Sequence, residues 1–190
     1  MEKTRSLANW VSVGFSTSEP ARSWSVGHRE VATRRSREGA YSFREATHAD
    51  ILKMKLIRDN VRENSLVSGS IEIVDYEQAL FVDGKGWVCV HRGDIVGFSC
   101  GRLEQSDIWA LFVDELHEGR GIGNKLMELA EVWMFWNGCG EIRLTTEAGT
   151  RAERLYRRRG WRDHGLLPSG EIDFRLNLRD QWSLKLTRPS

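Results

Sequence analysis

Hydrophobic positions along this chain fall into short runs that alternate between strand-like and helix-like spacing from about residue 41 onward. A continuous apolar run over 108–113 predicts a buried strand, and a polar turn then leads through three glycines into an amphipathic run that begins near Asn124. Apolar residues over 126–135 recur at helical spacing and are expected to pack on a sheet. The pattern therefore predicts a strand, a glycine loop and a helix.

The chain before this strand predicts a first strand, two helices and a hairpin. Alternation over 41–46 indicates the strand, and Thr47 with Asp50 forms an N-cap signature for a helix expected to end near 62–64. Turn signals separate the elements that follow. These are a short helix over 75–81, a turn at 83–86, and a hairpin with strands 87–90 and 95–100.

The chain after the glycine loop continues the alternation. Glycines at 138 and 140 stop the helix, and 141–146 predicts a strand that runs parallel to the buried strand, because a helix connects the two. A capping box at 150–153 opens a last helix that extends to residue 159, and a final strand is expected at 171–176. The predicted order is strand, helix, helix, three strands, helix, strand, helix and two strands.

Composition, charge and cysteine content narrow the class of protein. The chain has 190 residues with 40% hydrophobic content, which suits one globular domain, and no stretch approaches the ~20 apolar residues of a membrane span. Its net charge of +1 offers no argument for nucleic acid as a partner. The chain has three cysteines, Cys89, Cys100 and Cys139, which is an odd number, and their spacing is not that of a metal site. A reduced, cytoplasmic protein without a structural metal is expected.

Residues 1–40 differ from the rest because they carry an excess of basic residues and no periodicity. This segment is expected to be a mostly disordered basic extension, with the folded domain over 41–190. Polar residues interrupt the apolar stretch at 7–15, so it is not expected to be an export signal. The basic cluster at 34–37 leaves a second interpretation open, in which the extension tethers nucleic acid.

The glycine loop has the chemistry of an anion site. The first N–H groups of a helix have no intrahelical partner and carry partial positive charge, and glycines let a bulky anion approach the backbone. Gly119, Gly121 and Gly123 stand at this point, and Arg120 and Lys125 add positive charge. The sequence predicts a phosphate or pyrophosphate here. The spacing matches neither the P-loop nor the dinucleotide fingerprint, and a plain tight connection is the alternative.

Two motifs and the element order resemble the GCN5-related N-acetyltransferase (GNAT) superfamily over about residues 41–177. The motif at 113–123, VDELHEGRGIG, is similar to the superfamily's acetyl-CoA pyrophosphate loop. The motif at 150–161, TRAERLYRRRGW, is similar to its alanine-x-x-leucine-tyrosine-x-x-x-glycine-aromatic segment. The resemblance implies an α+β fold in α/β/α layers, with a mixed, mostly antiparallel central sheet, a splayed strand pair and flanking helices. The same resemblance implies that 41–190 is an N-acetyltransferase domain.

The resemblance also implies acetyl-CoA as the co-substrate, with no metal. Its expected contacts come from one strand and the glycine loop: Leu111, Phe112, Val113, Gly119, Arg120, Gly121, Ile122, Gly123, Asn124 and Lys125. A backbone N–H on the strand is expected to meet the oxyanion. Tyr156 occupies the position of the superfamily's general acid, and a phenol with pKa about 10 suits a thiolate near 8.5.

Amine acetylation also needs a neutral amine, and a lysine-like amine with pKa about 10.4 is almost wholly protonated at pH 7. Glu147 is the predicted base because it follows the carboxyl end of a predicted strand, where open sheets place their sites. Asp107 and a water chain remain as alternatives. Glu63, Asn64 and Trp109 are expected to line the acceptor cleft.

The sequence thus predicts a cytoplasmic enzyme that transfers an acetyl group directly to a primary amine of a small molecule or protein. Glu118 stands where the superfamily usually has Arg or Gln, and Gly149 where it often has Asn. These departures keep open a non-catalytic acyl-CoA-binding sensor or regulatory module. A membrane partner is not expected, and a homodimer formed through 171–186 is suggested by analogy alone.

Overall fold

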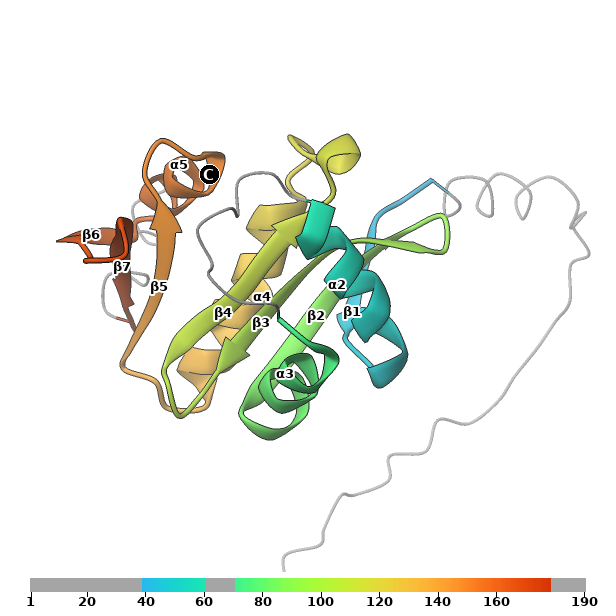
Figure 1. The fold of residues 1–190 in the computed structure, drawn as a ribbon, viewed down its shortest axis with the longest axis horizontal. Coiled ribbons are helices and arrows are strands. Elements are labelled where there is room, and N and C mark those ends of the chain that lie inside the picture. Colours follow the sequence, from blue (N-terminus) through green and yellow to red (C-terminus); the bar gives the residue numbers. More distant parts are fainter. Residues whose placement is uncertain (1–38, 61–70, 179–190) are drawn as a thin grey trace, which may run out of the picture.

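The computed structural model describes residues 39–60 and 71–178, and its elements follow the predicted order (Figure 1). The strands are β1 Ser42–Glu45, β2 Gly84–His91, β3 Asp94–Arg102, β4 Asp107–Val113, β5 Glu141–Glu147, β6 Arg162–Leu166 and β7 Glu171–Asn177. The helices are α2 Ile51–Asn60, α3 Ile73–Glu77, α4 Ile122–Trp136 and α5 Arg151–Arg158. Short helical turns are the 3₁₀ turns η1 His48–Asp50 and η3 Glu115–His117 and the π-helical turn η2 Gln78–Val82. Most of the basic extension, Glu63, Asn64 and the predicted end of the first helix lie outside the described residues.

The seven strands form one sheet in the order β1-β2-β3-β4-β5-β7-β6. Every neighbouring pair is antiparallel except β4 and β5, which are parallel as predicted. Helix α4 covers one face of the sheet, and α2 and α3 cover the other (Figure 1). The predicted mixed, mostly antiparallel sheet between helices is therefore confirmed.

The sheet separates two hydrophobic clusters. Helix α4 contributes to the first cluster the fully or almost fully buried side chains Ile122, Leu126, Met127, Ala130 and Met134. Helix α2 contributes Ile51, Met54 and Ile57 to the second. Because burying each large apolar side chain stabilises the fold by about 1.5–3 kcal/mol, these two faces hold the helices on the sheet. The predicted packing of α4 is confirmed, although Trp136 at its end is 88% exposed.

The predicted turn at 83–86 is wrong, because β2 already begins at Gly84. Gly84 pairs with Arg102 and Gly86 with Cys100 across the hairpin. A Cβ atom on Gly84 would collide with a backbone carbonyl of β3, and one on Gly86 with the side chain of Leu80. These glycines therefore permit close packing instead of a turn. The short helix predicted at 75–81 consists of α3 followed directly by η2.

The sequence pattern does not locate β6. All five of its residues are exposed, so no apolar alternation marks it, and its place comes from antiparallel pairing with β7. Strand β7 consequently lies between β5 and β6, with partners on both sides over 172–175. This arrangement does not favour pairing of two copies along β7. The remainder of the predicted dimer segment, 179–186, is outside the described residues.

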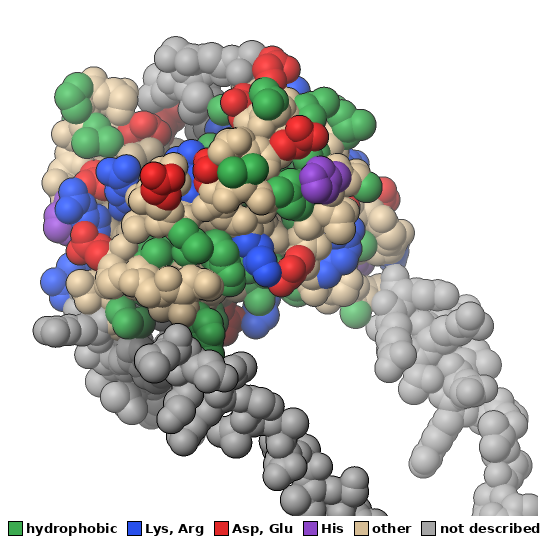
Figure 2. Space-filling view, turned by 90° about the horizontal axis from the view of Figure 1, so that it is seen from below, with side chains coloured by type: hydrophobic (Ala, Val, Ile, Leu, Met, Phe, Trp, Pro, Cys, Tyr) green, Lys and Arg blue, Asp and Glu red, His purple; other side chains and the backbone are tan. Residues whose placement is uncertain are grey.

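The surface seen in Figure 2 mixes side chains of both charges, without a large patch of one sign on that face. Among residues 39–60 and 71–178, no helix has the length and apolar character needed to cross a membrane. The same residues contain no group of His, Cys, Asp and Glu side chains arranged to hold a metal ion.

Candidate active site

Strands β4 and β5 run parallel but pair at one position only. Asp107 pairs with Arg143, whose N–H donates to the Ser106 carbonyl over 2.9 Å. Both strands are described in full, and beyond this bridge they separate (Figure 1). The splayed strand pair is thus confirmed, and the edge of β4 that faces β5 is not paired with it over 108–113.

A β-bulge re-aims the side chains of β4. Ala110 pairs with Cys100 on β3 and Ile108 pairs with Gly101, so Trp109 has no partner between them. Trp109 and Ala110, although consecutive, both pack in the cluster beneath α2, whereas Ile108 packs in the cluster beneath α4. The bulge therefore turns the Trp109 side chain to the α2 side of the sheet.

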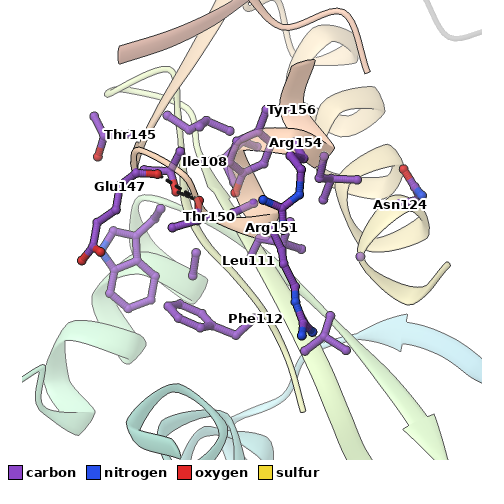
Figure 3. A pocket seen from close by; sticks show the side chains of 18 of the residues that line it. Ile108, Leu111, Phe112, Asn124, Thr145, Glu147, Thr150, Arg151, Arg154 and Tyr156 are labelled. Carbon is purple, nitrogen blue, oxygen red and sulfur yellow. Dashed lines mark hydrogen bonds between the residues drawn. The ribbon is translucent and has the colours of Figure 1, made fainter. Parts of the chain in front are cut away.

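A pocket of 1110 Å³ opens where the strands splay (Figure 3). Strand β4 forms one wall, β5 and the first turns of α5 form another, and the glycine loop with the start of α4 closes one end. The volume suits a large ligand. The predicted site residues that line it are Trp109, Leu111, Phe112, Val113, Gly119, Gly121, Ile122, Gly123, Asn124, Glu147 and Tyr156.

The glycine loop leaves the start of α4 free to bind an anion. Gly121 is the N-cap with a left-handed φ of 79°, and no side chain among the described residues caps the helix. The Lys125 N–H donates to the Gly121 carbonyl over 3.1 Å, so the N–H groups of 122–124 precede this first helical bond. These residues line the pocket, and the helix dipole favours negative charge there.

Two predicted cofactor contacts, Arg120 and Lys125, are not among the lining residues. Arg120 is exposed, and its Nη2 donates to the Leu116 carbonyl over 3.4 Å. Lys125 Nζ forms an ion pair of 2.9 Å with Glu128, one turn along the helix. Their positive charge lies near the loop without facing the pocket.

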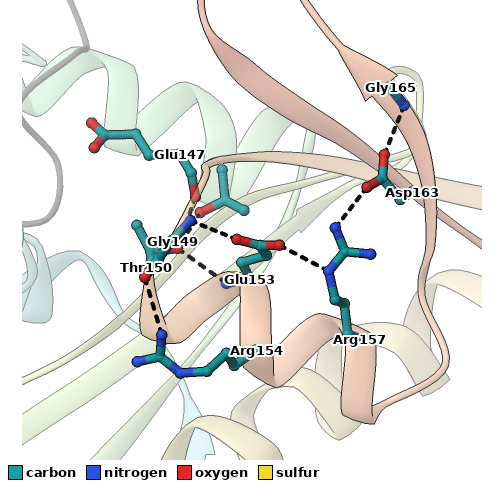
Figure 4. A network of polar contacts seen from close by, with 9 residues as sticks. Glu147, Gly149, Thr150, Glu153, Arg154, Arg157, Asp163 and Gly165 are labelled. Atoms are coloured by element: carbon teal, nitrogen blue, oxygen red, sulfur yellow. Dashed lines mark hydrogen bonds and ion pairs between the residues drawn. The ribbon is translucent and has the colours of Figure 1, made fainter.

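The first turn of α5 is fixed by a network of polar contacts (Figure 4). Thr150 Oγ1 accepts from the Glu153 N–H over 3.1 Å and donates to the Glu147 carbonyl over 2.9 Å, so its hydroxyl is occupied as predicted. The predicted capping box differs in its second half, because Glu153 Oε2 accepts from the Gly149 N–H over 2.6 Å instead of from Thr150. The hydrogen bond from the Gly149 backbone has the largest effect in lowering the pKa of Glu153, and the hydrogen bond from the Arg157 side chain lowers it further.

The same network ties α5 to β6. Arg157 donates to Glu153 over 2.8 Å and to Asp163 over 2.6 Å, and Asp163 accepts from the Gly165 N–H over 2.8 Å. Hydrogen bonds from Arg157 and Gly165 lower the pKa of Asp163. Helix α5 is held at both its start and its solvent-facing side.

Tyr156 is 5% exposed and lines the pocket from α5 (Figure 3). Its ring lies 6.0 Å from that of Trp161 and 5.9 Å from that of Phe174, measured between centroids. Burial, and then the negative charge of Glu131, raise the pKa of the phenol well above its ordinary value. The phenol is therefore protonated at neutral pH, as a proton donor must be, and the raised pKa makes it a weaker acid toward a thiolate near 8.5.

A buried carboxylate anchors the other end of α5. Glu131 on α4 is 0% exposed and accepts from Arg159 Nε over 3.0 Å, from Arg159 Nη2, and from Trp161 Nε1 over 3.0 Å. Arg159 Nη1 also donates to the Asn124 carbonyl over 3.1 Å. The network joins the helix of Tyr156 to the first turn of α4. The sequence signal is a charged residue on the apolar stripe of α4, four positions after Met127.

The two base candidates differ in availability. Glu147 lines the pocket at the end of β5, and in Figure 3 its carboxylate points away from Tyr156. Asp107 also lines the pocket, but both of its oxygens accept from Arg102, over 2.9 and 2.6 Å. The geometry leaves Glu147 as the better candidate of the two.

Solved structures share this fold, and acetyltransferases are among them. Ard1 from Thermoplasma volcanium is 22% identical, with 73% of this chain and 97% of that chain covered and a TM-score of 0.61. The ribosomal-protein-alanine N-acetyltransferase from Brucella melitensis is 20% identical, with coverage of 72% and 99% and a TM-score of 0.62. PaiA N-acetyltransferase from Thermoplasma acidophilum, solved in complex with coenzyme A, is 14% identical, with coverage of 73% and 99% and a TM-score of 0.57. These similarities establish the fold.

The family follows from the sequence itself. The model of the acetyltransferase (GNAT) family matches residues 55–161, which is more than half of the chain. Among curated proteins, none matches this chain. The chain belongs to the GNAT family of acetyltransferases.

Proposed function

We propose that this protein is an acetyl-CoA-dependent N-acetyltransferase that transfers the acetyl group directly to a primary amine of a small molecule or protein. The observation that carries the proposal is that one pocket joins three features: the uncapped start of α4, the unpaired edge of β4, and buried Tyr156. Family membership supports acetyl transfer in general.

The residues present suit acetyl-CoA. The N–H groups of 122–124 match a pyrophosphate, because they lack helical partners and the helix dipole adds positive potential. Backbone groups on the open edge of β4 over 111–113 suit the amides of the pantetheine arm, which needs strand-like hydrogen bonds. PaiA N-acetyltransferase from Thermoplasma acidophilum, which has a similar fold, has been solved in complex with coenzyme A.

The reaction then follows from the chain's own groups. A neutral amine attacks the thioester carbonyl carbon, and a backbone N–H of 111–113 stabilises the resulting oxyanion, an interaction worth about 3 kcal/mol. This attack forms the carbon–nitrogen bond. The carbon–sulfur bond then breaks as the oxyanion returns to a carbonyl, and Tyr156 gives its proton to the departing thiolate. The proton lost by the amine passes to Glu147, directly or through water. Trp109, with Glu63 and Asn64, lines the acceptor side in this proposal.

The non-catalytic sensor has less support. It depends on Glu118 and Gly149 weakening the cofactor site. Glu118 is paired with Arg151, and both backbone groups of Gly149 are engaged, with its N–H donating to Glu153 and its carbonyl accepting from Arg154 over 3.0 Å. Neither departure removes the free N–H groups of α4.

Two measurements on the full chain test the proposal. Acetyl-CoA at 100 times its dissociation constant should stabilise the fold by about 2.7 kcal/mol, read as a rise in Tm. Mixing the protein with acetyl-CoA and a panel of amines should release free thiol in proportion to acetylated amine. Stabilisation without thiol release from any amine would favour the sensor. If acetyl-CoA neither stabilises the protein nor yields free thiol, the pocket is not a site for acetyl-CoA.

A further inference from the structure

A buried arginine lies on the acceptor side of the pocket. Arg58, on α2, is 9% exposed and lines the pocket with Trp109 and Phe112. Its guanidinium carbon lies 5.1 Å from the ring centroid of each. An arginine is rarely buried to this degree unless it is paired. Its place next to Ile57 and four residues after Met54, on the apolar face of α2, makes its burial a property of the fold.

This arginine lacks the partner that its burial demands. Its Nη1 is buried and has no hydrogen-bond partner, and no carboxylate among residues 39–60 and 71–178 forms an ion pair with it. The hydroxyl of Tyr76 is also buried. The Tyr76 ring meets that of Trp109 edge-on at 5.1 Å. Unsatisfied buried donors are costly, and each one calls for an explanation.

Tyr76 lies next to Arg58 but is not part of the pocket wall. Burial raises the pKa of Tyr76 to about 12, and the positive charge and a hydrogen bond of Arg58 oppose that rise. Tyr76 is 0% exposed and is not among the residues that line the pocket, whereas Arg58 lines it beside the Trp109 and Phe112 rings. A planar anion with two oxygens matches the planar guanidinium of Arg58 and the flat aromatic rings next to it.

We propose that Arg58 binds a carboxylate of the acceptor, so that the acceptor is an amine of the amino-acid class. This inference rests on the proposed function. A phosphate dianion fits less well, because Arg102, which also lines the pocket, is already paired with Asp107. Glu147 and Glu171 also line the pocket, together with Arg143, Arg151, Arg154, Arg158 and Arg175, and their carboxylates suit an ammonium group. The lining therefore holds groups of both signs, which a molecule with one carboxylate and one amine requires.

The test compares each L-amino acid with its own amide, in which the carboxylate is replaced and the amine kept. With wild-type protein and acetyl-CoA, thiol release should show kcat/KM at least about tenfold higher for the best amino acid than for its amide. Arg58→Met should reduce this preference about tenfold or more, and Tyr76→Phe should reduce it less. Lys53→Met, on the exposed side of the same helix, is the matched control and should leave it unchanged.

A second readout does not depend on turnover. In the presence of CoA, N-acetyl-amino acids should raise the Tm of wild-type protein more than their amides do, and Arg58→Met should abolish the difference. Acetyl-CoA should stabilise Arg58→Met as much as it stabilises the wild type. Two outcomes would overturn the inference while leaving acetyl transfer intact. In the first, amino acids and their amides give equal kcat/KM and equal Tm shifts with the wild type. In the second, Arg58→Met lowers kcat/KM for amino acids and for amides by the same factor. Failure of the proposed function is distinct, because it removes acetyl-CoA binding or all thiol release.

Discussion

Glu118, at the head of the glycine loop, forms an ion pair with Arg151 in the first turn of α5. The contact joins the two sides of the pocket that flank the proposed pyrophosphate position. It also neutralises the carboxylate that departs from the pattern of the superfamily. In the proposed complex, the negative charge beside the pyrophosphate is thereby offset by a cation from a different element.

Substitutions at this pair should change acetyl-CoA affinity in opposite directions. Arg151→Met leaves Glu118 uncompensated beside the pyrophosphate and should raise the Kd for acetyl-CoA about three- to tenfold. Glu118→Gln frees Arg151 and should leave the Kd equal or lower. Both side chains are partly exposed, so the effects are modest and should shrink at high salt. Calorimetric titration at two salt concentrations measures this, and a weaker Kd for Glu118→Gln would contradict it.

Gly123→Asp should prevent acetyl-CoA binding without weakening the fold. A Cβ at this position meets Leu155 at 3.6 Å and Val113 at 3.8 Å, which are ordinary contacts. The carboxylate would occupy the anion position, yet a negative charge at a helix start stabilises the helix. We expect the Tm of the unliganded protein to stay equal or rise while the Tm shift with acetyl-CoA disappears. Gly123→Ala is the control and should keep most of that shift.

Tyr156→Phe should lower kcat more than tenfold and leave acetyl-CoA affinity within a few fold, because only the proton donor is lost. Burial places the pKa of this phenol well above 10. Its proton is therefore retained as pH rises, and kcat of the wild type should show no alkaline decline below about pH 10 from this group. Pre-steady-state thiol release across pH 6–10 tests both statements. An unchanged kcat in the variant would exclude Tyr156 from the mechanism.

The Glu131 network should matter mainly for stability. Arg159→Met leaves a buried carboxylate without its cation and should destabilise the protein by about 3–5 kcal/mol. Combining it with Glu131→Gln removes the uncompensated charge and should recover a substantial part of that loss. Urea unfolding of the two single variants and the double variant gives the coupling energy. Simple additivity of the single effects would show that the pair is not coupled.

Asp50 gives a pH dependence of known sign. This carboxylate is 6% exposed, and Arg44, which donates to it over 2.6 and 2.8 Å, lowers its pKa to about 2. Because the folded pKa lies below the ordinary 3.8, the stabilisation is complete above about pH 4 and is lost as pH falls through about 2. It amounts to about 2 kcal/mol. Urea unfolding should show that Asp50→Asn costs more at pH 6 than at pH 2.5.

Local patterns in the sequence were sufficient for the glycine loop, the capped start of α5 and the sheet-facing side of α4. Each depends on residues a few positions apart, so turn chemistry and helical spacing report on it directly. The polar strand β6 carries no such pattern, and its position comes only from pairing with β7. The bulge at Trp109 likewise depends on the register of β3, which no local signal reveals.

The sequence by itself determined the element order, the family and the glycine-rich start of α4, because these follow from local spacing and motifs. Tertiary structure decided which side chains share the pocket. Arg58 and Glu131 both stand on apolar stripes, a visible sign of buried charge, yet one lacks a described ion-pair partner and the other is paired with Arg159. That difference arises from the packing of helices far apart in the chain, where distance and burial set the electrostatic energy.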